Sequence, residues 1–191
     1  MGEAKNETWY NKYYKIHQET GGEYVKKPEQ TFYWPVWEIA LKWIGHARVV
    51  DLGCGPGQFG LACMRKGILY KGYDFSPQAI EMAGEITGHP KCFKVADITK
   101  NMGIGFDKHK VVVTLETLEH INNDLGILED IPKGMRVIFS VPSFDYKSHV
   151  RLFKDKAAVK KRYGKLLDIR TVKDIEIGPE KYIFLAEGVR K

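Results

Sequence analysis

The sequence predicts an α/β fold in which helices cover both faces of a mostly parallel β-sheet. Three observations lead to this fold class. From residue 35 onwards, apolar runs of strand length alternate with segments of helical spacing. Two β-rich runs close the chain with only a turn between them. A glycine-rich turn follows the first predicted strand, at the edge where open parallel sheets bind their ligands.

The predicted elements follow one another along the chain in this alternating order. Pro35 opens the first helix, which ends before Gly45. Strands are then predicted at residues 48–52, 69–74, 92–95, 110–115 and 136–141. Further helices are predicted at residues 58–66, from Ser76 onwards, at 124–128 and at 150–161. The final strands, 169–177 and 182–189, are separated by the turn pair Gly178-Pro179.

The chain is expected to form a single domain over residues 1–191. This length suits one domain with a substantial core, and no internal repeat or linker divides it. Residues 1–34 are rich in Tyr and Trp and show no clean period, whereas residues 35–191 carry the alternating pattern of the core.

Composition indicates a cytoplasmic protein with no membrane partner. The three cysteines form no CxxC pair, which favours reduced thiols. No basic and apolar leader opens the chain, and its longest apolar runs are far too short to cross a bilayer. Residues 147–173 hold ten Lys or Arg against two Asp, within a net charge of +6. This segment is either a solvated helix face or a surface that attracts RNA or another phosphate.

The strongest local signal is the sequence VDLGCGPG at residues 50–57. Gly53, Gly55 and Gly57 let the backbone turn tightly and approach a ligand closely. The helix that follows presents free N–H groups to an anionic group, and a carboxylate serves as well as a phosphate. Gln58 stands where a dinucleotide-binding fingerprint needs a third glycine, which argues against a nicotinamide cofactor.

Two acidic residues close the next two predicted strands. Asp74 ends the second strand, where an acid reaches the hydroxyl pair of a ribose. Asp97 ends the third strand, where its carboxylate either accepts a hydrogen bond from an adenine amino group or only caps a turn.

The ordered blocks VVDLGCGPGQFG, GYDFSPQAIEMA, KVADI, VVVTLETLEHI and RVIFSVPSF resemble the class I S-adenosylmethionine-dependent methyltransferases. The resemblance covers about residues 47–144. It implies a Rossmann-like, seven-stranded, mainly parallel sheet with an antiparallel last strand. It also implies S-adenosylmethionine as cofactor and S-adenosylhomocysteine as product. None of the blocks identifies the methyl acceptor.

The resemblance assigns cofactor-binding roles residue by residue. Asp51, Gly53, Cys54, Gly55 and Gly57 belong to the turn that holds the methionine part of the cofactor, and Asp74 holds the ribose. Phe75 and Ser76 lie beside the adenosine, Asp97 and Ile98 flank adenine, and Leu115 with Glu116 lines the floor near the sulfonium. In this superfamily the segment before the first strand often covers the cofactor. Residues 1–34 are therefore a candidate lid, with Tyr14 and Tyr33 in contact with the cofactor, or they simply pack on the sheet edge.

Glu116, Glu119, His120 and the later His149 permit two interpretations. In one, Glu116 lines the cofactor pocket while Glu119 and His120 brace the following segment. In the other, residues 116, 119 and 120 share one face of a helical turn and form a divalent-cation site with His149. That arrangement is similar to metal-assisted 2′-O-methyltransferases of small-RNA 3′ ends and to some quinone-precursor O-methyltransferases. The sequence assigns no residue firmly as a metal ligand. Glu119, His120 and His149 are its candidate catalytic residues, as general bases for a hydroxyl acceptor.

These observations lead to one predicted function and several alternatives. The prediction is methyl transfer from S-adenosylmethionine to an oxygen or nitrogen of a small molecule. The alternatives are metal-assisted 2′-O-methylation of RNA and cofactor binding without catalysis. Methylation of DNA base amino groups is disfavoured, because no (Asp/Asn/Ser)-Pro-Pro-(Tyr/Phe) motif follows the fourth strand.

Overall fold

A computed structural model describes residues 2–100, 104–106 and 110–191. Its centre is one seven-stranded sheet with the strand order β3-β2-β1-β4-β5-β7-β6. The strands are β1 (Arg48–Leu52), β2 (Tyr70–Asp74), β3 (Phe93–Val95), β4 (Lys110–Thr114), β5 (Arg136–Pro142), β6 (Leu167–Gly178) and β7 (Lys181–Arg190). Strands β1 to β5 pair in parallel, and β7 is antiparallel to both of its neighbours. The predicted sheet and its antiparallel last strand are confirmed.

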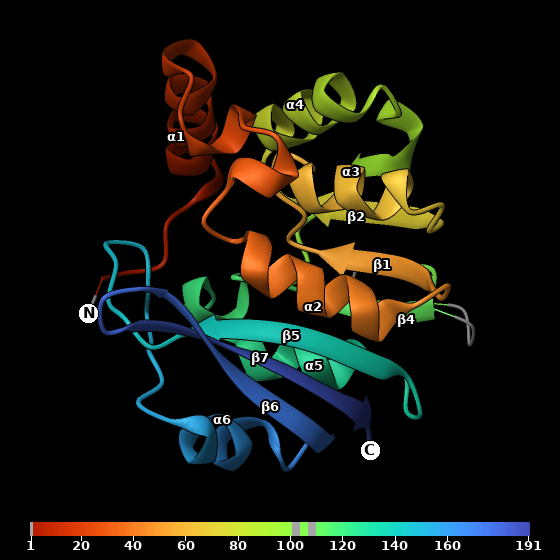
Figure 1. Cartoon of the computed structure of the whole chain (residues 1–191), viewed down its shortest axis with the longest axis vertical. Helices are drawn as coiled ribbons and strands as arrows, with labels where there is room; N and C mark the ends of the chain where they lie inside the picture. The colour runs from red at the N-terminus through yellow and green to blue at the C-terminus, as the bar shows by residue number, and fades with distance from the viewer. Residues whose placement is uncertain (1, 101–103, 107–109) are drawn as a thin grey trace.

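Helices cover both faces of this sheet, as Figure 1 shows. They are α1 (Glu7–Thr20), α2 (Trp34–Ile44), α3 (Gln58–Arg65), α4 (Pro77–Thr87), α5 (Asp124–Asp130) and α6 (Lys156–Tyr163), with 3-10 turns η1 (Glu23–Val25), η2 (Pro28–Gln30), η3 (Pro90–Cys92) and η4 (Leu118–His120). Alternate residues of the central strands point to opposite faces. Val49, Val111 and Val113 pack with α2 and α3, whereas Val50 and Val112 pack with α5 and α6. This is why the central strands are apolar on both faces.

Helix α1 is an element that the sequence pattern does not predict. Asn6 caps it by accepting a hydrogen bond from the Trp9 N–H at 3.0 Å, and Gly21 ends it in the left-handed conformation. Its buried face consists of tyrosines, and Tyr14 packs with Ala79 and Met82 of α4. An aromatic face with polar tips hides the helical period, so the segment reads as irregular.

The helix predicted at residues 150–161 is wrong over its first part, because α6 begins only at Lys156. Asp155 caps α6 by accepting from the Ala158 N–H at 2.7 Å. The residues before it are held by other elements: the Val150 N–H donates to Glu119 O at 2.8 Å and the Phe153 N–H to Pro142 O at 3.0 Å. Their apolar side chains follow these attachments rather than a helical period.

No helix in the described part of the chain combines the length and the apolar character that a membrane span requires.

Candidate active site

A cavity of about 870 Å³ opens at the carboxyl ends of the parallel strands. It is lined by the turn after β1, by Asp74 at the end of β2, by Asp97 after β3 and by Leu115 after β4. Helix α1 and the segment that follows it supply further aromatic walls. The volume lies near the upper end of the range for ligand pockets, roughly 300–1,000 Å³.

The glycine turn between β1 and α3 forms one wall of this cavity. Gly53 has a φ of 81°, and a Cβ there would lie 2.4 Å from the Thr117 side chain. Gly57 has a φ of 80°, and a Cβ there would lie 2.7 Å from Ala83. Both positions therefore require glycine, for conformation and for space. Gly55 and Cys54 also line the cavity, and a Cβ at Gly55 would lie 3.5 Å from the Tyr14 hydroxyl.

Asp74 is anchored across the same turn. One carboxylate oxygen accepts from the Gly55 N–H and the other from the Ser76 N–H, each at 2.9 Å. Burial raises the pKa of Asp74 to about 6, against the lowering effect of these backbone hydrogen bonds. Ser76, expected beside the adenosine, is fully buried and does not line the cavity. It caps α4 through the Ala79 N–H and donates to Asn11 of α1 at 2.6 Å.

Asp51 lies at the cavity floor and is 3% exposed. Its carboxylate accepts a short hydrogen bond from the buried Tyr70 hydroxyl. Burial raises the pKa of Asp51 to about 7. The carboxylate is therefore held by a hydrogen bond to Tyr70 of β2, the strand next to its own.

The residues expected to lie around adenine line the cavity, although the acid among them has local partners. Asp97 and Ile98 line the cavity together with Phe75. The Asp97 carboxylate accepts from the Thr99 N–H and hydroxyl at 3.0 and 2.6 Å and pairs with Lys100 at 2.9 Å. These contacts are those of a turn-capping acid and hold the pKa of Asp97 below its usual range against partial burial.

Glu116 follows β4 in an unusual backbone conformation. Its φ of 51° is in the left-handed region, which bulky side chains seldom adopt. Its N–H donates to Ser140 Oγ, and that hydroxyl donates back to the Glu116 carboxylate, both at 2.9 Å. Burial raises the pKa of Glu116 to about 7. Leu115 and Glu116 both line the cavity, as expected.

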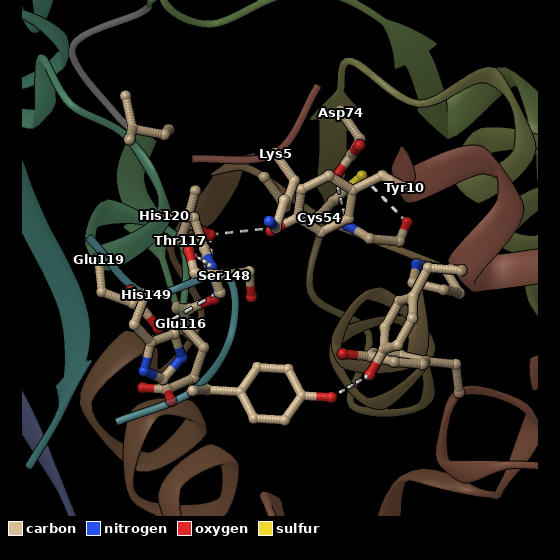
Figure 2. Close-up of a pocket in the computed structure, with 18 of the residues that line it drawn as sticks. Lys5, Tyr10, Cys54, Asp74, Glu116, Thr117, Glu119, His120, Ser148 and His149 are labelled. Atoms are coloured by element: carbon tan, nitrogen blue, oxygen red, sulfur yellow. Dashed lines mark hydrogen bonds and ion pairs between the residues drawn. The ribbon is translucent and has the colours of Figure 1, made fainter. Parts of the chain in front are cut away.

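Glu119, His120 and His149 come together on the other side of the cavity, opposite Asp74 and Cys54 (Figure 2). One potential ligand atom from each of the three lies within 4.8 Å of the others. Glu119 is 0% exposed, and neither of its carboxylate oxygens has a hydrogen-bond partner among the described residues. The His120 Nε2 is 3.7 Å from Glu119 Oε1.

The idea that residues 116, 119 and 120 share a helical face is wrong. Glu119 and His120 lie in the 3-10 turn η4, and Glu116 precedes it in the left-handed conformation. The cluster therefore consists of three residues, with Glu116 braced separately by Ser140.

The two histidines are oriented by backbone carbonyls. His120 Nδ1 lies 3.0 Å from Ser148 O, and His149 Nδ1 lies 3.0 Å from Phe144 O. Because a carbonyl only accepts, Nδ1 carries the proton and Nε2 keeps its lone pair. Burial lowers the pKa of His120 to about 4, with a further contribution from His149, and burial also lowers the pKa of His149. Both rings are therefore neutral near pH 7.

The pKa of Glu119 is shifted in the opposite direction to those of the two histidines. Burial, reinforced by the nearby Glu116, raises the pKa of Glu119 well above its usual range. A buried carboxyl without a partner is costly for the fold unless something else satisfies it. One carboxylate oxygen and two imidazole nitrogens form a donor set that suits several divalent cations. The residues present fit such an ion.

The N-terminal segment contributes more than the sequence analysis assigned to it. Tyr14 and Tyr33 line the cavity as expected. Tyr10 was missed, although it lies one helical turn before Tyr14. Its ring lies 5.3 Å from Phe75 and 6.1 Å from His120, centroid to centroid, and so joins the two sides of the cavity. Its spacing from Tyr14 was the available signal, but it is recognisable only once α1 is known to be a helix.

Comparison with known proteins agrees with this architecture. The family described as "Methyltransferase domain" matches residues 24–174, most of the chain. The ubiquinone biosynthesis O-methyltransferase of Vibrio cholerae is 26% identical over 110 residues, which are 54% of this chain and 45% of that protein. The chain thus matches less than half the length of this curated relative.

Solved structures show the same fold at low identity. The magnesium protoporphyrin IX methyltransferase of Synechocystis PCC 6803, determined with bound S-adenosylmethionine, has a TM-score of 0.67 at 16% identity, with all of both chains covered. A putative methyltransferase of Haloferax volcanii, in complex with the Trm112 activator, has a TM-score of 0.70 at 16% identity. There, 95% of this chain and 97% of that chain are covered.

The family match, the strand order and the glycine turn agree with one another and with the resemblance seen in the sequence. The chain belongs to the methyltransferase domain family and has the class I, Rossmann-like fold, which it shares with the structure determined with bound S-adenosylmethionine.

Proposed function

We propose that this enzyme methylates a hydroxyl oxygen of a small molecule and that Glu119, His120 and His149 hold a divalent cation beside that oxygen. The observation that carries the proposal is the Glu119 carboxyl, fully buried and without a hydrogen-bond partner among the described residues. It faces two imidazoles whose Nε2 atoms are free to coordinate. The name of the Vibrio cholerae relative, an O-methyltransferase, supports oxygen as the acceptor atom.

The cofactor-binding residues are proposed from their positions around the cavity. The Gly53–Gly57 turn would receive the methionine part, and Asp74 the ribose hydroxyls, because its carboxylate is already held in place by Gly55 and Ser76. Phe75, Asp97 and Ile98 would enclose adenine. Tyr14 and Tyr33, within the proposed lid of residues 1–34, would cover the cofactor.

The chain's own residues would mainly orient the reactants. S-adenosylmethionine supplies an activated methyl group on its sulfonium, so that alignment of the acceptor is the main task. A bound divalent cation would lower the pKa of a coordinated hydroxyl. If no ion is bound, the neutral Nε2 of His120 or His149 could instead accept the hydroxyl proton.

The same cluster is compatible with 2′-O-methylation of RNA, because one potential ligand atom of His149 lies within 4.8 Å of those of Glu119 and His120. The basic segment 147–173 favours a small molecule instead. Several of its cations have partners inside the protein: Arg151 and Arg162 pair with Asp124, and Lys156 pairs with Asp174. Less of its charge is therefore available to phosphates than the sequence alone suggests.

We propose a cytoplasmic location because of the state of the cysteines. Cys54, Cys63 and Cys92 are all free thiols, as expected in a reducing compartment.

Cation binding can be tested by calorimetric titration of chelator-treated protein with Mn²⁺ at pH 7, for wild type, Glu119→Gln and Glu85→Gln. Glu85 is a matched control, because its carboxylate is on the surface and accepts a hydrogen bond from Gln18. Wild type and Glu85→Gln should bind one ion, and Glu119→Gln should bind it about tenfold or more weakly. Failure of wild type to bind Mn²⁺, or equal binding by all three, would contradict the cation site.

The acceptor can be tested with radiolabelled S-adenosylmethionine and three probes: a catechol, the corresponding aromatic amine, and a short RNA with a free 3′ end. Methylation of the catechol that stops when EDTA is added would support the proposal. Methylation of the amine alone would contradict the oxygen acceptor. Methylation of the RNA alone would replace the small molecule by the nucleic-acid alternative.

A further inference from the structure

The cluster of Glu119, His120 and His149 is assembled from two separate segments. Glu119 and His120 lie in η4, between β4 and α5, whereas His149 lies in the loop after β5. Two hydrogen bonds near the cluster join these segments: the Val150 N–H donates to Glu119 O at 2.8 Å, and His120 Nδ1 donates to Ser148 O at 3.0 Å. The distance between the segments therefore decides whether the three side chains meet.

Arg151 lies two residues after His149 and reaches across to η4. Its Nη1 donates to Leu118 O and, at 2.6 Å, to Ile121 O, and its Nη2 donates to Asn122 O at 3.0 Å. These carbonyls bracket Glu119 and His120 on both sides. Leu118 O also accepts from the Ile121 N–H at 3.3 Å, whereas Ile121 O and Asn122 O lie beyond the end of the turn, where carbonyls lack partners within it. A guanidinium can satisfy several such carbonyls at once.

The Arg151 side chain is only 15% exposed and needs a nearby negative charge. Asp124, at the start of α5 and 0% exposed, lies 3.4 Å from Arg151 Nη1. Asp124 is fixed in turn by α6, through two hydrogen bonds from Arg162 at 2.8 and 2.6 Å and one from the Tyr163 hydroxyl at 2.8 Å. Of these partners of Asp124, Arg151 is the one that donates to the carbonyls around η4 in the described part of the chain.

We infer that Arg151 is a positioning residue for the candidate cation site. It ties η4 to the loop that carries His149, and it anchors both to the buried Asp124. The inference rests on the proposed function, because it treats Glu119, His120 and His149 as one site. Arg151 itself touches neither the expected cofactor nor the ion, since it does not line the cavity.

The test compares Arg151→Met and Arg151→Lys with Arg162→Met. Arg162 is a matched control, because it also pairs with Asp124 but, among the described residues, makes no hydrogen bond to the carbonyls around η4. For each full-length variant, three quantities are measured: the free energy of unfolding in urea, Mn²⁺ affinity by calorimetry, and the amide exchange rate of Val150 by NMR. S-adenosylmethionine affinity is measured alongside, as a check on the other side of the cavity.

Arg151→Met should weaken Mn²⁺ binding about 10- to 100-fold, the usual effect of losing a residue that orients metal ligands. It should also accelerate Val150 amide exchange at least about tenfold and leave S-adenosylmethionine affinity within about twofold. Arg151→Lys should recover part of the Mn²⁺ affinity, because an ammonium reaches fewer carbonyls than a guanidinium. Arg162→Met should lose a similar amount of stability while keeping its Mn²⁺ affinity.

Equal losses of Mn²⁺ affinity in Arg151→Met and Arg162→Met, in proportion to their stability, would overturn the inference and leave Arg151 with a purely structural role. If wild type binds no Mn²⁺, the proposed cation site fails. The amide exchange rate of Val150 then tests whether Arg151 ties the two segments together. Faster Val150 exchange in Arg151→Met than in Arg162→Met would still support the tie between the two segments, whereas equal rates would refute it.

Discussion

Buried acids differ according to what holds them. Asp74 is buried but receives backbone N–H groups on both oxygens, so its carboxylate stays fixed and aimed into the cavity. Glu119 is buried more completely and receives none from the described residues. The first arrangement is that of an acceptor prepared for a neutral ligand such as a pair of hydroxyls. The second is that of a carboxyl which stays protonated unless a cation stabilises its charged form.

We predict that Asp74→Asn weakens S-adenosylmethionine binding about tenfold or more. The amide cannot accept from both the Gly55 and Ser76 N–H groups, and it loses the charge that strengthens a hydrogen bond to a ribose hydroxyl. Calorimetry at pH 7.5 measures the change. Asp97→Asn should cost less, because the Asp97 carboxylate is already used by Thr99 and Lys100. A larger loss in Asp97→Asn than in Asp74→Asn would contradict this assignment of the ribose contact.

At the residue scale, the sequence predicts contacts that depend on local spacing. The glycine turn and Asp74 lie at strand ends that the apolar pattern already locates, so their neighbourhood follows from the fold class. The separation of Glu116 from Glu119 could not be predicted in this way. It depends on a left-handed φ at Glu116 and on the Ser140 hydroxyl of β5, two features without a signature in the sequence.

At the element scale, α1 is the part of the fold that the sequence did not reveal. It is joined to the loop after β5 by a cluster of aromatic rings around one cation. The Lys147 ammonium lies 5.3 Å from the Trp9 ring centroid, 5.4 Å from that of Tyr13 and 5.7 Å from that of Tyr146. The hydroxyls of Tyr13 and Tyr146 are 3.2 Å apart. These contacts join α1 to the loop, and both segments line the cavity. Moving α1 away from the cavity would therefore break them.

We predict that Lys147→Met speeds the release of S-adenosylhomocysteine about two- to fivefold. Loss of a partly exposed cation–π cluster costs roughly 0.5–1 kcal/mol, which should lower the barrier to lifting α1. Stopped-flow measurement of Trp fluorescence gives the rate. Lys154→Met is the matched control, since Lys154 is an exposed lysine near the same loop whose ion pair, among the described residues, is with Asp155. An unchanged release rate in Lys147→Met would mean that this contact does not limit opening.

The other difference at this scale concerns α6, which begins six residues later than its apolar pattern predicts. The apolar side chains at Val150 and Phe153 belong to a segment attached to η4 and β5 by backbone hydrogen bonds. Arg151 lies between them and turns inward. Tertiary contacts thus decide the conformation of a segment whose local pattern is compatible with a helix.

At the scale of the whole molecule, the sheet was predictable because its central strands are buried on both faces and therefore read as continuous apolar runs. The same burial has an electrostatic consequence. Asp51, Asp74, Glu116 and Glu119 all lie at the carboxyl edge of that sheet, and burial raises the pKa of each. The binding cavity is thus formed where acids are most costly to ionise.

We predict that the ligand-free fold loses stability as pH rises from 6.5 to 8. Carboxyls with raised pKa values keep protons in the folded chain that the unfolded chain has released above about pH 4.5, so unfolding becomes more favourable as pH rises. His17, His120 and His149 act in the opposite direction, because their pKa values are lowered. Their effect fades above pH 6.5, the pKa of an unfolded histidine, and offsets only part of the loss up to about pH 7.5. Towards pH 8 the buried Cys54 and Cys63 thiols, whose pKa values burial also raises, act in the same direction as the carboxyls.

Urea unfolding in EDTA, for wild type and Glu119→Gln at pH 6.5 and 8, measures this effect. Wild type should lose roughly 1–2 kcal/mol between the two pH values, at about 1.4 kcal/mol per pH unit for each carboxyl that stays protonated in the fold. Glu119→Gln should lose less, because glutamine does not titrate in either state, and it should therefore be the more stable protein at pH 8. Mn²⁺ should reduce the wild-type loss, since the ion competes with the proton for Glu119. If both proteins lose the same stability, the pH dependence arises elsewhere, and Glu119 is not the strained acid that its surroundings indicate.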